Sequence, residues 1–414
     1  METTGLRTRL LLLLLLTASY AQAQEFQILH IFTDGPDGAV PVAGLTLDQG
    51  GNLYGAALGG GLSGNGTVFR LTHTDSGWSF ATLYSFRGGY DGTGAGSNVI
   101  FGPDGDLYGT TTLPGFYGPT AQAWGTVYKL SPPPPSCKDA CAWSETILHR
   151  FLGRTQGYDP GYLNIVFDAA GNIYGTTMYG GDIGGNCFDD GCGVVYELTQ
   201  IGEDWSYSVL YRFTGQGSDG NVPISGIALG QQGNLYGATE YGGLYESGNV
   251  YELIPSPAGW AENTIYSFGG YPAEGSLTFD RAGNLYGTTC CGGAQVYELS
   301  RLNGGWMLTT IHDFYGDGYF IPNGDLVVDE AGNLYGTTYN GGTGGGNVFK
   351  LTPGIGGWIY TDLHDFHGPD GASPFGGVTL DANGNIFGTT ARGGDMFGCA
   401  PPSGCGVVWE ITQD

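Results

Sequence analysis

The segment Gly283-Asn284-Leu285-Tyr286-Gly287-Thr288-Thr289 decides the fold, because close copies of it recur along the chain. A repeat of roughly 40–50 residues or slightly more is typical of a β-propeller blade, a four-stranded sheet that buries its faces against neighbouring blades. The repeats therefore predict one domain rather than the several that length alone would suggest. Successive copies start 54, 66, 62, 50, 49 and 52 residues apart, at Gly51, Gly105, Gly171, Gly233, Gly283, Gly332 and Gly384.

Each repeat predicts four antiparallel strands. A short apolar stretch such as Leu277–Phe279 comes first and the heptad second, with Asp280 placed to cap the tight turn between them. A third strand of alternating apolar and polar residues follows a glycine-rich loop, as at Gly66–Leu71. In the fourth strand a Trp precedes a Phe by eight residues, and this even offset predicts both rings on one face of the strand. The pairs are Trp78/Phe86, Trp143/Phe151, Trp205/Phe213, Trp260/Phe268, Trp306/Phe314 and Trp358/Phe366.

The last repeat stops at its third strand, and the missing strand is found at the other end of the chain. The segment 24–32 has the same eight-residue frame, and Ile28–Phe32 resembles Thr310–Phe314. We expect it to pair with the third strand of the last repeat, which removes an open sheet edge. The sequence thus predicts an all-β, seven-bladed propeller of four-stranded blades, closed by residues 24–32.

A glycine follows the aromatic residue of the heptad and lies inside a predicted strand. Glycine at such a position usually marks the close approach of another backbone. We expect that approach at Gly55, Gly109, Gly237 and Gly336.

The heptad, the Gly-Gly loop and a third strand of the form Gly-Thr-Val-Phe-x-Leu resemble the tandem repeat of the GloVer, or choice-of-anchor, proteins. The resemblance covers nearly all of residues 24–414 and implies a secreted or surface-attached bacterial propeller, without implying an activity. Two features depart from that family: Ala294 opens the third strand of the fifth repeat in place of Gly, and we expect no anchor segment of the kind that follows the repeats in many members. A weaker likeness, to NHL-type and streptogramin-lyase-like propellers, rests on the Gly-Asn-hydrophobic-aromatic turn alone.

The charge of the chain bears on its partners. With 39 Asp+Glu against 13 Lys+Arg, the formal net charge is −26. Nucleic acids and anionic membrane surfaces are bound by clustered Lys and Arg, so this charge argues against both as partners. The chain is 41% hydrophobic and 13% aromatic, which distinguishes it from disordered acidic proteins.

Residues 1–23 have the pattern of a secretory signal peptide. Arg7 and Arg9 precede the apolar run Leu10–Leu16, and Ala21 and Ala23 supply the small residues of a cleavage site. The run is shorter than the roughly 20 residues that span a bilayer. We therefore expect a secreted or periplasmic chain of residues 24–414 without a membrane span, with an uncleaved N-terminal anchor as the alternative.

The eight cysteines fall into four close pairs, which in an oxidising compartment predict short disulfide-closed loops. Zinc is the alternative, although no His is near any pair in sequence. A bridge between adjacent cysteines strains the peptide link, so free thiols and a strained bridge stay open for the third pair. The pairs are Cys137/Cys141, Cys187/Cys192, Cys290/Cys291 and Cys399/Cys405.

The connections from strand four to the next blade repeat an acidic turn. One hypothesis is a ring of carboxylates that binds Ca²⁺ or a polar ligand through oxygen atoms. The alternative is turn chemistry, because Asp-Gly is a favoured turn pair, and the sequence has no calcium-loop motif. We expect no obligatory cofactor. The residues are Asp37, Asp91, Asp159, Asp219, Asp317 and Asp370, with Glu274 in the remaining turn.

The connections from strand two to strand three emerge on the same face and carry aromatic residues. Aromatic rings beside carboxylates suit carbohydrate, since sugar C–H faces stack on the rings and carboxylates accept hydroxyl hydrogen bonds. The alternative is that these rings pack the rim of the propeller. Tyr179, Tyr241 and Tyr339 are the ligand-binding candidates, and Phe116, Tyr117, Trp124, Tyr245 and Phe397 lie in the same loops.

An enzyme is the competing class, and its histidine signal is weak. Four histidines share one fourth-strand position, where other blades have Tyr, which indicates a structural role. His367, near Asp370, is the one candidate catalytic residue on the loop-bearing face. The sequence therefore favours a binding or scaffold module for a glycan or an extracellular protein, with a metal-assisted lyase or hydrolase and a purely structural envelope protein as alternatives. The four histidines are His30, His149, His312 and His364.

Overall fold

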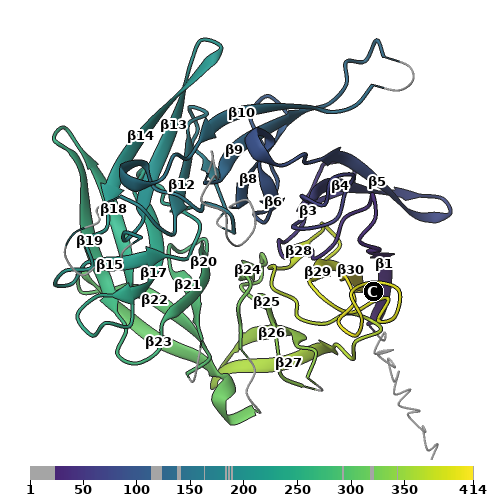
Figure 1. Cartoon of the computed structure of the whole chain (residues 1–414). Helices are drawn as coiled ribbons and strands as arrows, with labels where there is room; N and C mark the ends of the chain where they lie inside the picture. Colours follow the sequence, from purple (N-terminus) through teal and green to yellow (C-terminus); the bar gives the residue numbers. More distant parts are fainter. Residues whose placement is uncertain are drawn as a thin grey trace, which may run out of the picture.

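The computed structural model shows a ring of seven antiparallel sheets around a centre (Figure 1). In the part of the chain that it describes, the only helical segments are three short 3-10 turns. The described residues are 24–112, 124–137, 141–162, 164–181, 184, 187, 190–290, 293–317, 321–342 and 344–413. The seven-bladed propeller predicted from the repeats is confirmed, whereas the segment 1–23 lies outside the described residues.

Each blade has an inner strand, the heptad strand and two outer strands. They follow chain order except in blade 7, where β1 is outermost, and in blades 2 and 4 the inner strand is divided in two. Blade 1 contains β2 (Thr46–Leu47), β3 (Leu53–Ala57), β4 (Thr67–Thr74) and β5 (Gly77–Ser85). Blade 2 contains β6 (Thr93–Ala95), β7 (Ile100–Phe101), β8 (Leu107–Thr112), β9 (Thr126–Ser131) and β10 (Ser144–Arg150). Blade 3 contains β11 (Val166–Phe167), β12 (Ile173–Thr177), β13 (Val194–Ile201) and β14 (Asp204–Arg212). Blade 4 contains β15 (Gly220–Pro223), β16 (Ala228–Leu229), β17 (Leu235–Gly242), β18 (Asn249–Ser256) and β19 (Gly259–Ser267).

The remaining three blades follow the same plan. Blade 5 contains β20 (Ala273–Phe279), β21 (Leu285–Thr289), β22 (Gln295–Leu302) and β23 (Gly305–Asp313). Blade 6 contains β24 (Val327–Val328), β25 (Leu334–Thr338), β26 (Asn347–Gly354) and β27 (Gly357–Asp365). Blade 7 contains β28 (Thr379–Leu380), β29 (Ile386–Thr390), β30 (Val407–Thr412) and β1 (Glu25–Ile31). The 3-10 turns η1 (Gly89–Asp91), η2 (Arg154–Gln156) and η3 (Phe314–Asp317) lie between blades.

The ring is closed as the repeat count predicts. Strand β1 pairs with β30 from Glu25 opposite Thr412 to Ile31 opposite Val407. At the centre of the ring, the hydroxyl of Thr389 in blade 7 donates a 2.7 Å hydrogen bond to the carbonyl of Ala43 ahead of blade 1. Both ends of the chain therefore contribute to one sheet.

The Trp and Phe of each outer strand lie on opposite faces, so the prediction of a shared face was wrong. A β-bulge interrupts every outer strand pair between the two rings; in blade 1, for example, Tyr84 pairs with Val68 but Thr82 pairs with Phe69. The extra residue reverses the alternation. Consequently Trp78 packs in the core between blades 7 and 1, and Phe86 in the core between blades 1 and 2.

The heptad glycine makes room for an aromatic ring, not for another backbone as predicted. A Cβ at Gly55 would lie 2.4 Å from the ring of Phe69, and one at Gly237 would lie 2.2 Å from the hydroxyl of Tyr251. Each ring belongs to the residue directly across on the third strand of the same blade. Glycine is required here because the ring crosses its Cα and fills the space of a side chain.

The four fourth-strand histidines stack on the next blade. His149 lies 3.9 Å from the Tyr207 ring at an interplanar angle of 6°, and His364 lies 3.7 Å from Phe26 at 1°. Burial lowers the pKa of His149 to about 4, which keeps the stacked ring uncharged. His30 and His312 stack in the same way on Phe80 and Tyr360.

The junction of blades 1 and 2 replaces this stack with a hydrogen-bonded acid pair. The Tyr84 hydroxyl lies 2.7 Å from Oδ1 of Asp91 and 3.2 Å from Oε2 of Glu145. Burial, reinforced by the neighbouring Asp91 carboxylate, raises the pKa of Glu145 to about 9. Because the fold keeps Glu145 neutral, this junction stabilises the folded protein most at low pH. Its contribution to stability falls as the pH rises.

We expect a chain that begins at Thr33 to be less stable than one that begins at Gln24, by more than ~3 kcal/mol. The shorter chain loses β1 and the fully buried Phe32, and loss of a core Phe alone costs about that much. Urea unfolding of both chains measures the difference. A peptide of residues 24–32 should restore part of the stability, and equal stability of the two chains would contradict closure by β1.

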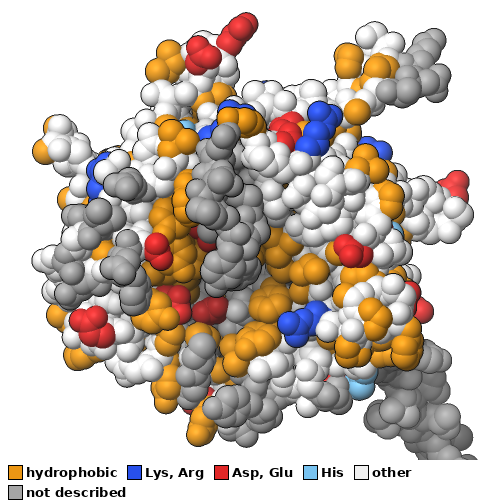
Figure 2. All heavy atoms as spheres, in the orientation of Figure 1, with side chains coloured by type: hydrophobic (Ala, Val, Ile, Leu, Met, Phe, Trp, Pro, Cys, Tyr) orange, Lys and Arg blue, Asp and Glu red, His pale blue; other side chains and the backbone are white. Residues whose placement is uncertain are grey.

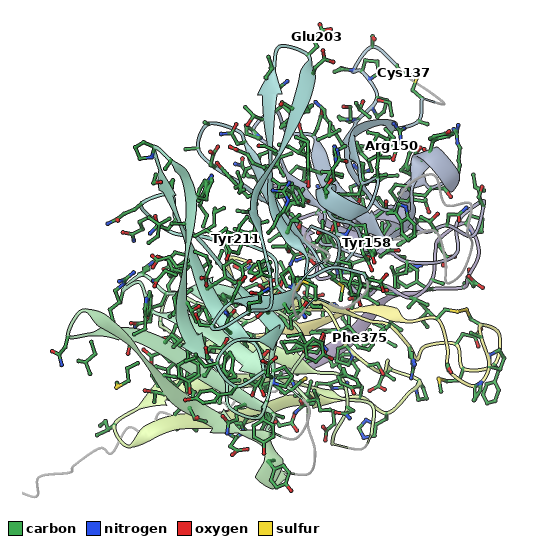
Figure 3. All side chains as sticks on the ribbon, turned by 60° about the vertical axis from the view of Figure 1, so that its left-hand side comes forward. Cys137, Arg150, Tyr158, Glu203, Tyr211 and Phe375 are labelled. Atoms are coloured by element: carbon green, nitrogen blue, oxygen red, sulfur yellow. A yellow bond between two sulfur atoms is a disulfide. The ribbon has the colours of Figure 1, made fainter. Side chains whose placement is uncertain are left out.

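We expect Glu145→Gln to stabilise the protein by ~1 kcal/mol at pH 8 and to have no effect at pH 4. The stabilising contribution of Glu145 is complete below the unfolded pKa of 4.5 and is lost as the pH rises toward about 9, whereas Gln stays neutral. Thermal unfolding across this pH range tests the expectation. Glu203→Gln, at the exposed tip between β13 and β14 (Figure 3), is the control and should show no such pH dependence.

Candidate functional site

Seven equivalent residues surround the centre of the propeller, and each stands directly before a buried apolar residue of the inner segment of its blade. They are small or polar because the chain segments of neighbouring blades nearly touch there. A Cβ at Gly377 would lie 2.7 Å from the carbonyl oxygen of Asp325, and one at Gly226 the same distance from that of Asn164. We call this set the central ring; its residues are Gly44, Asn98, Asn164, Gly226, Ser276, Asp325 and Gly377.

Side chains of the central ring close the channel. The Asn164 amide of blade 3 donates a 2.5 Å hydrogen bond to Oδ2 of Asp325 in blade 6, and the Ser276 backbone N–H donates to Oδ1 at 2.7 Å. Asn164 in turn accepts from the Asn98 backbone N–H at 2.9 Å. Burial raises the pKa of Asp325, and the hydrogen bonds from Ser276 and Asn164 oppose this shift. The bonds form a floor across the centre.

A cavity of about 430 Å³ lies above this floor, on the face that carries the strand 2–3 and strand 4–1 connections, here called the loop face. Figure 2 shows hydrophobic side chains gathered around the centre of the ring, with acidic side chains beside them. The lining combines apolar, amide and carboxylate groups, and none of the described residues in it is Lys or Arg. Beside the central ring, its main side chains are Leu58, Tyr162, Met178, Ile224, Glu274, Asn323 and Phe375.

Glu274 is the carboxylate nearest the loop face among the lining residues. It belongs to β20, and the Asn323 amide donates a 2.8 Å hydrogen bond to its Oε1. Burial, followed by the nearby charge of Glu240, raises the pKa of Glu274 to about 7. Among the described residues none donates a hydrogen bond to Oε2, which leaves that atom able to accept from a ligand.

An aromatic row runs along the rim of the cavity through blades 2, 3 and 4. The Trp124 and Tyr158 rings lie 5.1 Å apart, and Tyr158 stacks on Tyr179 at 5.4 Å. Tyr241 continues the row, and its hydrogen bond to Glu240 raises the pKa of its hydroxyl to about 12. In Figure 3, Tyr158 and Phe375 both lie toward the middle of the ring.

The three tyrosine candidates are not among the described residues that line the cavity, but each lies close to residues of that lining. Tyr179 and Glu274 both lie close enough to Tyr241 to contribute to the raised pKa of its hydroxyl. Tyr339 stacks on Phe375 of the cavity wall, with centroids 5.2 Å apart. Of the other loop aromatics, Tyr245 and Phe397 point to solvent, and Phe116 and Tyr117 lie outside the described residues.

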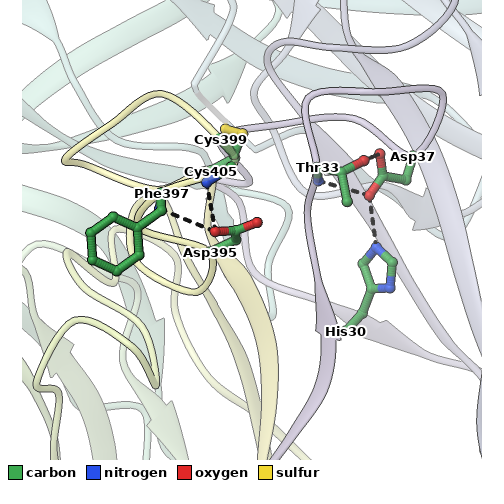
Figure 4. The surroundings of a disulfide bond; sticks show 8 residues. His30, Thr33, Asp37, Asp395, Phe397, Cys399 and Cys405 are labelled. Carbon is green, nitrogen blue, oxygen red and sulfur yellow. Dashed lines mark hydrogen bonds and ion pairs between the residues drawn. A yellow bond between two sulfur atoms is a disulfide. The ribbon is translucent and has the colours of Figure 1, made fainter.

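Four of the acidic-turn candidates hold their own turns. Asp37 accepts from the Thr33 backbone N–H at 2.9 Å and contacts His30 at 3.1 Å (Figure 4). Asp91, Asp219 and Asp370 accept the corresponding backbone N–H groups of Arg87, Thr214 and His367. Within the described part of the chain, no group of three or more His, Cys, Asp or Glu residues could hold a metal ion.

Asp159 and Asp317 differ from these four. Gly157 corresponds to Gly38, which directly follows Asp37. Asp159 lies two residues after Gly157, so it does not occupy the turn position of Asp37 that the sequence predicted for it. It sits instead beside Tyr158 and Tyr162, where burial raises the pKa of its carboxyl to about 6. The side chain of Asp317 lies outside the described residues.

Three of the four predicted disulfides are present: Cys137–Cys141, Cys187–Cys192 and Cys399–Cys405. No described cysteine is free, Cys290 included, whereas Cys291 lies outside the described residues. The Cys187–Cys192 and Cys399–Cys405 bridges fix strand 2–3 connections on the loop face. Figure 4 shows Cys399–Cys405 beside the Asp37 turn. Disulfides are consistent with a protein that works outside the cytoplasm.

No helix in the described ranges is long and apolar enough to cross a membrane.

His367 does not line the cavity. Its ring is exposed, with Nδ1 3.7 Å from Oδ2 of Asp370, a carboxylate that also contacts His364 at 2.9 Å. Apart from Glu274, the polar residues that do line the cavity were not predicted from the sequence, above all Asn164, Asn323 and Asp325. Their signal was present, since a polar or small residue stands just before every apolar inner strand, but it did not show which of them meet.

We expect Asp325→Ala to lower the free energy of unfolding by ~2–4 kcal/mol, because two buried donors, Ser276 N–H and the Asn164 amide, lose their acceptor. Asp325→Asn retains one acceptor and should cost less. Asp75→Ala, at an exposed hairpin tip, is the control and should be neutral. Chemical unfolding measures all three, and an unchanged stability of Asp325→Ala would contradict the proposed floor.

Several solved structures share the architecture at low sequence identity, which shows the fold alone. A candidate 6-phosphogluconolactonase from Bacteroides fragilis has a TM-score of 0.50 and 16% identity, over 84% of this chain and 87% of its own. A candidate 6-phosphogluconolactonase from Bacteroides uniformis has a TM-score of 0.50 and 13% identity, over 87% of this chain and 98% of its own. A polysaccharide lyase, an ulvan lyase solved with bound GlcA(1-4)Rha3S, has a TM-score of 0.51 and 13% identity, over 88% of this chain and 90% of its own.

The sequence itself identifies the family. The comparison with curated proteins gives no match. The model of the Gloeobacter/Verrucomicrobia repeat matches residues 17–185, 117–297 and 268–414, and together these ranges include all seven heptads. The chain therefore belongs to the Gloeobacter/Verrucomicrobia repeat family, in agreement with the resemblance carried by the heptad.

Proposed function

We propose that this protein is a secreted binding module that recognises a glycan in the central cavity of its loop face. The observation that carries the proposal is the meeting of the aromatic row with the carboxylate and amide groups of the cavity. Tyr179 and Tyr241 come from different blades, and both lie near Glu240. Aromatic faces and hydrogen-bond acceptors side by side are what a sugar ring requires.

The size and rigidity of the cavity support this proposal. A volume of about 430 Å³ falls within the usual range for small-molecule sites, roughly 300–1,000 Å³, and accommodates a short piece of a sugar chain. The walls belong to strands and to short connections between strands. Binding to a preformed site loses less conformational entropy than binding to flexible loops.

Secretion is part of the proposal and rests on two features of the chain. Residues 1–23 have the pattern of a signal peptide, and the disulfides need an oxidising compartment to form. A glycan ligand suits a protein outside the cytoplasm.

The enzyme and purely structural hypotheses have less support. His367, the histidine candidate, is exposed and outside the cavity lining. A purely structural protein has no need of an open cavity with a carboxylate oxygen in its wall that has no donor among the described residues.

We expect Tyr241→Ala and Tyr179→Ala each to weaken glycan binding about fivefold or more, because each removes a stacking surface worth about 1 kcal/mol or more. The chain of residues 24–414 is applied to a glycan array, and the best ligand is then titrated by calorimetry. Tyr245→Ala is the matched control, since Tyr245 follows Tyr241 in the same connection but is 64% exposed. An array without any bound glycan, or binding that survives both substitutions, would refute the proposal.

A further inference from the structure

We infer that the cavity takes the end of a sugar chain, and that the terminal residue carries a protonated amine. This inference rests on the proposed glycan-binding function. It specifies which part of the glycan enters the cavity and which charge that part carries. It depends on three features of the described residues: the closed floor, the sign of the charges around the cavity, and the free oxygen of Glu274.

The closed floor decides which part of a glycan can enter. The Asn164–Asp325 hydrogen bond joins blades 3 and 6 across the centre at 2.5 Å. The glycine positions of the central ring leave no room beside it, since even a methyl group at Gly226 or Gly377 would lie 2.7 Å from a neighbouring carbonyl. A chain cannot thread through the propeller. Because this floor bars passage through the centre, an extended polymer would enter the cavity from the loop face by an end.

The charges around the cavity decide the charge of that end. Glu274 and Asp325 line the cavity, Glu240 acts on Glu274 at the rim, and no Lys or Arg is among the lining residues. The whole chain adds a formal charge of −26. Such a site repels uronate, sulfate and phosphate groups and attracts a cation, most strongly where water is excluded.

Glu274 supplies the direct contact for the amine. Asn323 holds Oε1 and so fixes the orientation of the carboxylate, while Oε2 has no donor among the described residues. An ammonium group on the terminal sugar would donate to Oε2, and the sugar ring would contact the aromatic side chains of the lining, Tyr162 and Phe375. A charge-assisted hydrogen bond of this kind is stronger than a bond between neutral groups.

The test compares three oligosaccharides of equal length: oligomers of glucosamine, of N-acetylglucosamine and of galacturonate. We expect the glucosamine oligomer to bind the chain of residues 24–414 at least tenfold more tightly than the acetylated one in calorimetry at pH 7, and the galacturonate oligomer not to bind. Competition should follow the number of chain ends rather than the total amount of sugar. Long glucosamine polymers should therefore compete less per unit mass than short ones.

Glu274→Gln is the diagnostic variant, because it keeps the shape and the Asn323 contact but removes the charge. It should abolish the tenfold preference, so that the amine and the acetylated oligomer bind with similar affinity. Glu246→Gln, with the same loss of charge at an exposed position of blade 4, should keep the preference.

The outcomes separate this inference from the proposed function. Tyr241-dependent binding of the acetylated oligomer as tight as that of the amine would overturn the amine preference and leave the glycan-binding function intact. Competition that follows total sugar would overturn recognition of a chain end. Binding of none of the three oligomers, together with an empty glycan array, would overturn both proposals.

Discussion

The pairing of β1 with β30 is the constraint on which the rest of the structure depends. Each blade is a sheet with two apolar faces, and both are buried only if every blade has two neighbours. The chain satisfies this requirement by bringing residues near its two ends into one sheet. The junctions on either side of that sheet use residues of β1 directly: Phe26 stacks on His364 of blade 6, and His30 stacks on Phe80 of blade 1. Without β1, two blade junctions and one sheet edge would be left open.

The seven junctions meet the same packing requirement with different chemistry. Four place a histidine ring flat on an aromatic ring of the next blade. The junction of blades 1 and 2 uses a tyrosine and two carboxyl groups, and that of blades 3 and 4 brings Tyr211, Asp219 and Glu262 together, where burial raises the pKa of Glu262 to about 7. Histidine stacks favour neutral or higher pH, whereas the buried acids favour lower pH. The stability of the ring therefore reflects opposing pH dependences at different junctions.

The cavity is a consequence of how the blades meet at the centre. The inner strands are only two residues long in several blades, so the residues before them come close together without forming a regular sheet. Small residues allow this approach, and the polar ones among them find partners across the centre. The result is a closed floor under a cavity whose carboxylates lack a basic partner among the lining residues. The features on which ligand recognition is proposed to depend thus arise from the irregular part of each repeat.

The sequence by itself determined the number of blades, the order of strands and the closure, because each of these follows from a periodic pattern that repeats seven times. It also identified three disulfides, whereas the ligand-binding role of Tyr179, Tyr241 and Tyr339 stays a prediction. Two local predictions were wrong for reasons that a linear pattern does not contain: a bulge at Leu83 places Trp78 and Phe86 on opposite faces, and the Phe69 ring, not a backbone, occupies the space at Gly55.

Only the tertiary structure decided which residues form the site. Asn164 and Asp325 are separated by 161 positions, and nothing local indicates that they hydrogen-bond. The same holds for Glu274 and Asn323, which belong to neighbouring blades. Periodic packing can be predicted from sequence because every repeat satisfies the same constraint. The site depends on residues in which the repeats differ, and their contacts are set by the angles and distances at which seven blades close into a ring.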